Sequence, residues 1–251
     1  HVLLQHRAAW SHEGGTWALP GGARSSTENA LATATREAAE EAAVDPAAVT
    51  PSVSWVDDHG PWSYTTVVAH TQVPVEARAA DPESVELRWV RLDAVASHPL
   101  HPAFAAAWPR LREHTTCRLV VVVDAANVVG SRPDGWWRDR MSANIRLRDG
   151  LAELAQRGIA ASALALPAEL WWPDIRLVVE GQARGVESVA GVTVRPADRD
   201  GDTLIAETVA ESRRERPDDH LIAVTADRAL RSYVQDLGAA VVGPATLLNL
   251  L

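Results

Sequence analysis

Three glutamates near the start of the chain have the spacing of metal-binding side chains. Glu37, Glu40 and Glu41 are three and four positions apart, so in a helix their carboxylates share one face. Like charges at this spacing destabilise an isolated helix, and a cation is expected to compensate them. Mg²⁺ (or Mn²⁺) is the predicted cofactor because it prefers oxygen ligands. The alternative, for this glutamate-rich stretch alone, is a solvated acidic helix face.

The residues around these glutamates favour the metal site. Arg36 and Glu28 extend the spacing to G-x5-E-x7-R-E-x-x-E-E, a pattern that begins at Gly22. Just upstream, the run TWALPGG turns the chain tightly into the predicted helix. Gly21 and Gly22 have no side chain, which allows their backbone to approach a ligand or a metal. The segment therefore combines acids with a turn that can approach them.

This pattern resembles the Nudix box of the nucleoside-diphosphate-linked-moiety hydrolases. The resemblance covers about residues 1–112 and implies an α/β/α sandwich with a mixed sheet, placed here at 1–115. A first strand of that fold is expected to be missing before the strand-like run HVLLQHR. One position departs from the pattern, because Ala43 stands where the family usually has glycine. Alanine in a left-handed helix end costs about 1 kcal/mol, and this cost does not fall on the ligands.

The resemblance implies Mg²⁺-dependent hydrolysis of the pyrophosphate bond of a nucleoside di- or triphosphate or nucleotide derivative. The implied metal ligands are the Gly21 carbonyl, Glu37, Glu40 and Glu41. The implied catalytic residues are Glu37, Glu41, Glu83 and Arg36. A carboxylate takes a proton from the attacking water, and both Glu37 and Glu83 are candidates for this base. Arg36 is expected to pair with Glu28 and orient the helix.

Composition limits the classes of protein that the chain can belong to. It has 251 residues, of which 47% are apolar and 23% charged, as in soluble globular proteins. The single cysteine, Cys117, excludes an internal disulfide framework and favours a reducing cytoplasm. No apolar run approaches the ~20 residues of a membrane span, and no signal peptide is apparent. All 24 basic residues are arginine, which excludes a lysine Schiff base and a Walker-type phosphate loop.

The charge balance argues against a broad nucleic-acid-binding surface. The formal net charge is −9. Residues 1–115 carry 8 arginines against 14 acids, and residues 116–251 carry 16 against 19. Neither part has the basic excess of a non-specific nucleic-acid binder.

A second domain, 116–251, is predicted from a change of pattern at about residue 116. From Arg118 onward, apolar strands alternate with helical stretches, which predicts a parallel sheet flanked by helices. Three apolar runs stop on an acid, at Asp124, Glu180 and Asp227. Because ligands of open α/β sheets bind beyond the carboxyl ends of the strands, these acids are expected to converge.

Further polar residues join this predicted cluster. Asp200 and Asp202 come just before another helix, and Asn127 follows Asp124 by three positions. Such oxygen ligands suit one or two Mg²⁺ or Mn²⁺ ions that activate water for phosphodiester cleavage. The alternative is that these acids cap helices, which applies above all to Asp227.

The second segment resembles the NYN branch of the PIN-like nuclease fold. The resemblance rests on VDAAN, DGDTLIAE and VTADRALR in this order, and it covers about residues 118–251. It implies metal binding by Asp124, Asp202 and Asp227, with Asn127 as an accessory contact to substrate. The family's fourth acid is not identifiable, so a non-catalytic copy is an open alternative.

The stretch DGWWRDR (134–140) is the candidate for contact with RNA. Trp136 can stack on a base while Arg138 meets a phosphate. The alternative is that the tryptophans pack on the sheet or on the first domain.

The predicted protein is a two-domain cytoplasmic enzyme, a Nudix-like pyrophosphohydrolase joined to a PIN/NYN-like domain that cleaves RNA. One rival hypothesis is a metal-dependent ribonuclease whose Nudix-like part senses nucleotides. Another is that the second domain is an inactive module for RNA binding or interaction.

Overall fold

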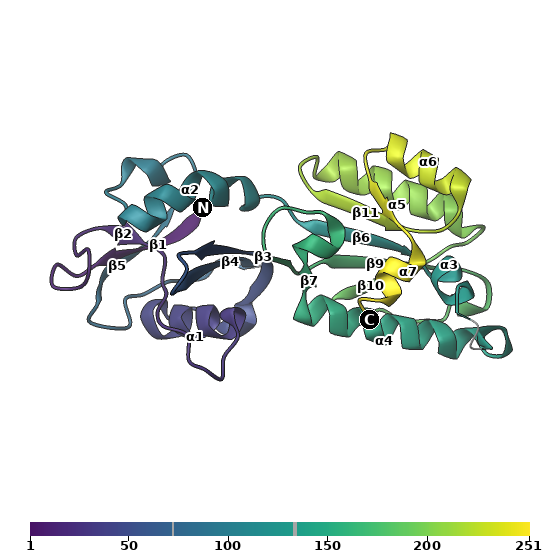
Figure 1. Cartoon of the computed structure of the whole chain (residues 1–251), viewed down its shortest axis with the longest axis horizontal. Coiled ribbons are helices and arrows are strands. Elements are labelled where there is room, and N and C mark those ends of the chain that lie inside the picture. Colours follow the sequence, from purple (N-terminus) through teal and green to yellow (C-terminus); the bar gives the residue numbers. More distant parts are fainter. Residues whose placement is uncertain (72, 133–134) are drawn as a thin grey trace. The chain divides into compact units, whose positions relative to one another are not determined.

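The computed structural model of the chain describes residues 1–71, 73–132 and 135–251. The chain divides into two compact units, residues 1–115 and 116–251. Figure 1 labels the helices and strands of both.

The first unit contains two helices and five strands, joined by short 3₁₀ turns. In chain order these are β1 (Val2–Arg7), β2 (Trp17–Ala18), α1 (Ala30–Ala42), η1 (Pro46–Ala48), β3 (Val49–Asp58), β4 (Ser63–Thr71), β5 (Ser84–Val90), η2 (Val95–Ser97) and α2 (Pro102–His114). Strand β1 lies between β2 and β5 and is antiparallel to both, and β3 and β4 form an antiparallel hairpin. Within the described part of this unit, the parallel pairing expected of a mixed sheet is limited to a bridge between Trp17 and Leu100.

Helix α1 has the boundaries that its sequence favours. Its N-cap, Asn29, accepts a hydrogen bond from Ala32 N at 2.9 Å. It ends at Ala43, which has φ 54° and ψ 30°, as predicted for the position of the family's glycine. The amides of Ala43 and Val44 close this end on the carbonyls of the last turn. The helix therefore ends at the expected position, with Ala43 in the left-handed conformation.

The second unit is built from alternating strands and helices. Its elements are β6 (Leu119–Asp124), α3 (Ala125–Gly130), η3 (Trp136–Arg138), α4 (Arg140–Arg157), β7 (Ile159–Ala160), η4 (Ala161–Leu164), β8 (Leu170–Trp171), β9 (Asp174–Val179), η5 (Gly181–Ala183), β10 (Val192–Pro196), α5 (Gly201–Glu215), β11 (His220–Val224), α6 (Arg228–Asp236), β12 (Ala240–Val242) and α7 (Pro244–Leu248). The prediction of a parallel sheet flanked by helices is confirmed.

The parallel sheet has the strand order β10-β9-β6-β11-β12, and every pairing in it is parallel. The order reverses at β6, because the chain adds β9 and β10 on one side and β11 and β12 on the other. Helices α3 and α4 contact β9, while α5 contacts β6 and β11 (Figure 1). A crevice at the carboxyl end of β6 is therefore the place where this topology favours a ligand.

Each unit has its own apolar core. In the first unit, Leu4, Trp17, Phe104 and Trp108 are buried together. In the second, β6 and β11 pack their valines and alanines against α5 and α6. Among the described residues, no helix combines the length and the apolar character needed to cross a membrane.

Candidate functional site

The acidic face of α1 is organised by one arginine. Arg36 Nη1 donates to Glu37 Oε1 at 2.9 Å and to Glu40 Oε2 at 3.0 Å, and its Nε donates to Glu28 Oε1 at 2.9 Å. The predicted pair between Arg36 and Glu28 is thus confirmed. Hydrogen bonding to Arg36 holds the pKa of Glu28 down to about 2. Arg36, predicted as catalytic, therefore positions the carboxylates of this face.

The glycine turn lies directly against these carboxylates. Gly21 N donates to Glu41 Oε2 at 2.9 Å. A Cβ atom on Gly22 would overlap the carboxylate of Glu37, so only glycine fits at this position without displacing that side chain. The turn and the helix consequently form one site, although about twenty residues separate Gly21 from Glu41.

Glu41 has the most enclosed carboxylate of the three glutamates. The side chain belongs to a residue that is only 7% exposed. Burial raises the pKa of Glu41 from 4.5 to about 6, opposed by the hydrogen bond from Gly21 and reinforced by the charges of Asp81 and Glu37. A buried carboxylate with acidic neighbours is stabilised by a bound cation, which removes this repulsion.

Asp81 is a neighbour of this site that the sequence interpretation missed. Backbone hydrogen bonds from Arg78 N to Ala42 O and from Ala80 N to Glu41 O bring this segment to the end of α1. Asp81 Oδ1 accepts from Ser84 N at 3.0 Å, which holds the carboxylate in place. The sequence gives no periodic signal for this approach, because residues 74–80 contain no helix or strand.

Glu83, the alternative general base, lies two residues beyond Asp81. Its side chain is exposed, and its carbonyl accepts from Ala8 N at 2.7 Å. Glu83 thus lies immediately before β5, two residues from Asp81.

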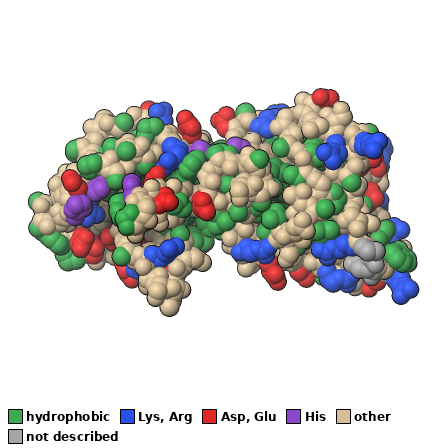
Figure 2. Space-filling model, in the orientation of Figure 1, with side chains coloured by type: hydrophobic (Ala, Val, Ile, Leu, Met, Phe, Trp, Pro, Cys, Tyr) green, Lys and Arg blue, Asp and Glu red, His purple; other side chains and the backbone are tan. Residues whose placement is uncertain are grey.

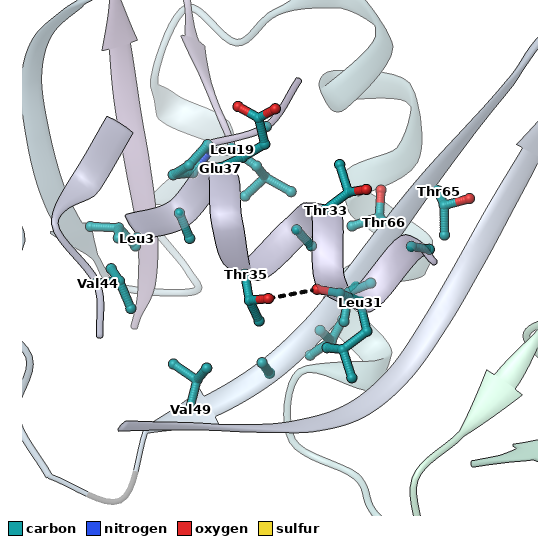
Figure 3. A pocket seen from close by; sticks show the side chains of 18 of the residues that line it. Leu3, Leu19, Leu31, Thr33, Thr35, Glu37, Val44, Val49, Thr65 and Thr66 are labelled. Carbon is teal, nitrogen blue, oxygen red and sulfur yellow. Dashed lines mark hydrogen bonds between the residues drawn. The ribbon is translucent and has the colours of Figure 1, made fainter. Parts of the chain in front are cut away.

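A cavity of about 450 Å³ lies beside α1 in the first unit (Figure 3). Its lining includes Leu3, Leu31 and Val49, together with Gly21 and Glu37 from the acidic site. Most of the labelled side chains are aliphatic or threonine, and Thr35 donates to the carbonyl of Leu31. The part of the cavity that lies away from the carboxylates is therefore largely apolar.

The donor set of the first unit fits a hard divalent cation. Glu37 and Glu41 offer carboxylate oxygens, one of them buried, and the Gly21–Gly22 turn approaches both. Glu40 is more exposed and pairs with Arg36. Carboxylates with a nearby backbone carbonyl are the ligands that Mg²⁺ takes in proteins.

The sequence of this unit matches a known domain. Residues 1–111 match the model of the NUDIX domain. The N-terminal unit is a Nudix domain. The match supports the resemblance seen in the glutamate pattern, and it ends before the second unit begins.

Two curated relatives match this part of the chain. A Mycobacterium tuberculosis protein called "Putative 8-oxo-dGTP diphosphatase 3" is 53% identical over 44% of this chain and 54% of its own length. A Bifidobacterium longum protein called "Nucleoside triphosphate pyrophosphatase/Nudix hydrolase fusion protein" is 48% identical over 44% of this chain and 23% of its own length. The chain thus spans about half the length, or less, of these curated relatives.

A solved structure gives a similar match. The Nudix hydrolase RenU from M. smegmatis is 50% identical, and the alignment covers 44% of this chain and 72% of that one, with a TM-score of 0.42.

Beyond the Nudix domain, the second unit gathers acids at the end of β6. Asp124 is 5% exposed. Its Oδ2 accepts from Asn127 Nδ2 at 2.7 Å and from Thr225 Oγ1 at 2.9 Å. Asn127 Oδ1 accepts from Ala226 N at 3.2 Å, so both the nitrogen and the oxygen of this side-chain amide are hydrogen-bonded. Asn127 therefore holds Asp124 in position, which its prediction as a substrate contact did not anticipate.

The pKa of Asp202 is affected by other acids of the second unit. Burial raises the pKa of Asp202, and the charges of Asp124, Asp227, Asp200 and Glu180 raise it further. Asp202 is therefore close enough to Asp124 and Asp227 for their charges to raise its pKa.

Some of these acids also serve the local fold. Asp227 Oδ1 accepts from Leu230 N at 2.8 Å and caps α6, as the alternative interpretation had it. Asp200 caps α5 through Thr203, and this lowers the pKa of Asp200. Glu180 Oε2 accepts from Gly201 N at 2.9 Å. Asp200 and Glu180, both expected at this edge of the sheet, thus each accept a hydrogen bond from a backbone amide at the start of α5.

The candidate RNA contacts lie on the turn before α4. Trp136 is half-buried, and the guanidinium of Arg140 lies 5.3 Å from the centre of its ring. Trp137 and Arg138 are exposed, and residue 134 of the predicted stretch lies outside the described residues. Figure 2 shows acidic and arginine side chains interspersed over the second unit on the face drawn. Contact with RNA on this face would accordingly be local.

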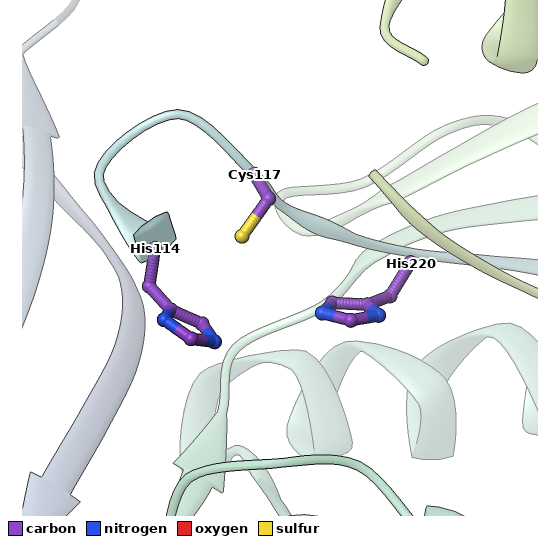
Figure 4. Close-up of side chains that lie close together, drawn as sticks. All are labelled: His114, Cys117 and His220. Carbon is purple, nitrogen blue, oxygen red and sulfur yellow. The ribbon is translucent and has the colours of Figure 1, made fainter. Parts of the chain in front are cut away.

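The single cysteine is buried in the second unit. Cys117 precedes β6, and its Sγ lies within 4.8 Å of a ring nitrogen of His220, the first residue of β11 (Figure 4). Burial raises the pKa of Cys117 to about 11, and the charge of Asp219 contributes. The thiol is therefore protonated at neutral pH and packs as a small apolar group.

Proposed function

We propose that the Nudix domain is a Mg²⁺-dependent pyrophosphohydrolase of nucleoside di- or triphosphates or nucleotide derivatives. The observation that carries this proposal is the meeting of Glu37 and Glu41 with the Gly21–Gly22 turn. A buried carboxylate is destabilised by a second carboxylate beside it, and a bound cation reduces this repulsion.

The residues of the site have distinct roles in this proposal. Glu37, Glu40 and Glu41 hold the cation, with the Gly21 carbonyl as a further ligand. When bound, the cation neutralises pyrophosphate oxygens and makes water a stronger nucleophile at neutral pH. Glu37 or Glu83 accepts the proton of that water. Arg36 positions Glu37 and Glu40 through its ion pairs.

The names of the relatives guide the choice of substrate. Both names refer to nucleoside triphosphates, one of them an oxidised purine nucleotide. Purine nucleoside triphosphates, with and without an 8-oxo group, are thus the first substrates to test, followed by dinucleotides and nucleotide sugars.

The test is hydrolysis of this panel with Mg²⁺, followed through the phosphate products released. Glu41→Gln is expected to reduce kcat/KM at least 100-fold because it removes one cation ligand. Glu153→Gln, on the exposed face of α4, is the matched control. Unchanged hydrolysis in Glu41→Gln contradicts the proposed function.

We further propose that the second unit is a PIN/NYN-like domain that cleaves RNA with divalent cations. The specific support is that four acidic charges raise the pKa of Asp202 where the strand order reverses. A fixed group of carboxylates at this position can hold cations that assist phosphodiester hydrolysis. Trp136 and Arg138 are the proposed contacts to RNA.

Cleavage of single-stranded RNA with Mn²⁺ or Mg²⁺ tests this second role. Asp202→Asn is expected to abolish cleavage, whereas Asp236→Asn at the exposed end of α6 is not. RNA binding without cleavage in the unaltered chain favours the inactive-module hypothesis. RNA cleavage that responds to nucleotides, without nucleotide hydrolysis, favours the sensing hypothesis.

A further inference from the structure

Two aromatic rings are stacked at the tip of the β3–β4 hairpin. The ring centroids of His59 and Trp62 are 4.1 Å apart, with an interplanar angle of 25°. Trp62 is nevertheless 57% exposed. A large ring that is supported by a stacked partner and still open to solvent offers a flat surface for another ring.

The turn that carries this aromatic pair, His59 and Trp62, is closed by local hydrogen bonds. His59 N donates to Trp62 O at 2.9 Å. Gly60 N donates to Asp58 Oδ1 at 2.8 Å, and Gly60 has φ +81°, a conformation that glycine adopts without strain. The rings are therefore already positioned, which lowers the entropic cost of binding a planar ligand.

Tyr64 connects the aromatic pair to the carboxylate site. It is the second residue of β4 and follows Trp62 by two positions, about 7 Å of extended chain. The Tyr64 hydroxyl lies 3.3 Å from the position that a Cβ atom on Gly21 would take. Gly21 in turn donates to Glu41. Trp62 is thus two positions along the chain from a side chain that adjoins the proposed phosphate site.

We propose that Trp62, supported by His59, stacks on the base of the nucleotide whose phosphates are held near Glu37 and Glu41. This inference rests on the proposed function of the Nudix domain and adds the position of the base. Stacking accepts any base, since every base has a flat face. The aromatic pair therefore supplies affinity for nucleotides as a class.

The test compares KM values for the purine nucleoside triphosphate that the unaltered chain hydrolyses fastest. Trp62→Ala is expected to raise KM at least tenfold with little change in kcat, because stacking stabilises substrate and transition state equally. Trp62→Phe is expected to restore most of the affinity. Tyr233→Ala, an exposed aromatic residue of the second unit, serves as the matched control.

Inorganic pyrophosphate separates base contact from phosphate contact, because it has no base. Its inhibition constant against the nucleotide is expected to be the same in Trp62→Ala as in the unaltered chain. A parallel rise in this constant, or an unchanged KM for the nucleotide, overturns the assignment of the base site.

The apolar cavity beside α1 is the competing position for the base. Ala34→Leu places a larger side chain in the lining of this cavity. If Ala34→Leu raises KM while Trp62→Ala does not, the base enters the cavity and the assignment to Trp62 is wrong. Glu41→Gln keeps the two proposals distinct, because its loss of activity together with an unchanged KM in Trp62→Ala rejects only the base site.

Discussion

The two acidic sites of this chain are assembled in different ways. In the Nudix domain, three glutamates lie within five residues of one helix, and Arg36 pairs with two of them. In the second unit, the acids come from segments that are separated along the chain, and the charges of four of them act on Asp202. Backbone amides and hydroxyl groups hold those carboxylates, as at Asp124 and Asp200.

This difference affects what each site needs from a cation. Arg36 already neutralises part of the charge on α1, so the geometry of the first site is maintained by the protein itself. In the second unit, hydrogen bonds position the carboxylates without removing their charge. Burial raises the pKa of Asp202, and repulsion by the neighbouring acids raises it further. A helical site is thus set by local spacing, whereas a sheet-edge site depends on the strand order.

The largest expected effect comes from the turn that closes the first site. Gly22→Ala introduces a Cβ atom that overlaps the carboxylate of Glu37. We expect kcat/KM for nucleotide hydrolysis to fall at least 100-fold, because displacing a catalytic carboxylate by an ångström is costly. Gly243→Ala is the control, since no atom lies within 4 Å of its added Cβ. Equal losses in both variants would point to general destabilisation.

A smaller effect is expected from pH. Burial raises the pKa of Glu41 to about 6, so this ligand is ionised above that pH and loses its charge below it. The affinity of the Nudix domain for Mn²⁺ should therefore fall about tenfold per pH unit below pH 6. Titration of Mn²⁺ from pH 5 to 8 measures this dependence. A midpoint near 4.5, the ordinary value for glutamate, contradicts the role given to burial.

The same burial predicts a gain in stability for a variant that loses activity. A raised folded-state pKa means that Glu41 favours the folded state below pH ~4.5 and loses this contribution as pH rises through 6. Glu41→Gln should accordingly raise the free energy of unfolding of the metal-free chain by about 1–2 kcal/mol at pH 7. Asp202→Asn should have the same sign in the second unit, because its pKa is raised as well.

Denaturant unfolding in EDTA measures both variants, and the transitions of the two units are followed separately where they are resolved. A destabilised Glu41→Gln variant would show that the Gly21 hydrogen bond outweighs the cost of the buried charge.

The smallest expected effect is at two alanines with left-handed backbone, Ala43 in the first unit and Ala165 in the second. Ala43 has φ 54° and Ala165 has φ 53°. Glycine at either position should stabilise its unit by about 0.5–1 kcal/mol, since the relief of strain exceeds the added freedom of the unfolded chain. Ala34→Gly, in the middle of α1, is the matched control and should destabilise by about 1 kcal/mol. Thermal unfolding of the three variants checks the signs.

Local spacing was enough to predict which three glutamates lie together on α1. The period of the helix puts Glu37, Glu40 and Glu41 on one face. Gly21 and Gly22 indicate the tight turn before the helix. The sequence also indicated the parallel sheet of the second unit, because strands and helices alternate there. Even the left-handed end of α1 at Ala43 followed from a single position in the pattern.

The sequence by itself determined which residues share a helix face and which acids end a strand, since both follow from the repeat of the backbone. Only the tertiary structure decided that Asp81 approaches Glu41, that Asn127 donates a hydrogen bond to Asp124, and that the charges of four acids raise the pKa of Asp202. These contacts join segments whose distance depends on strand order and loop path, and no local pattern encodes either. The exposure of Trp62 was decided in the same way, by the turn that stacks it on His59.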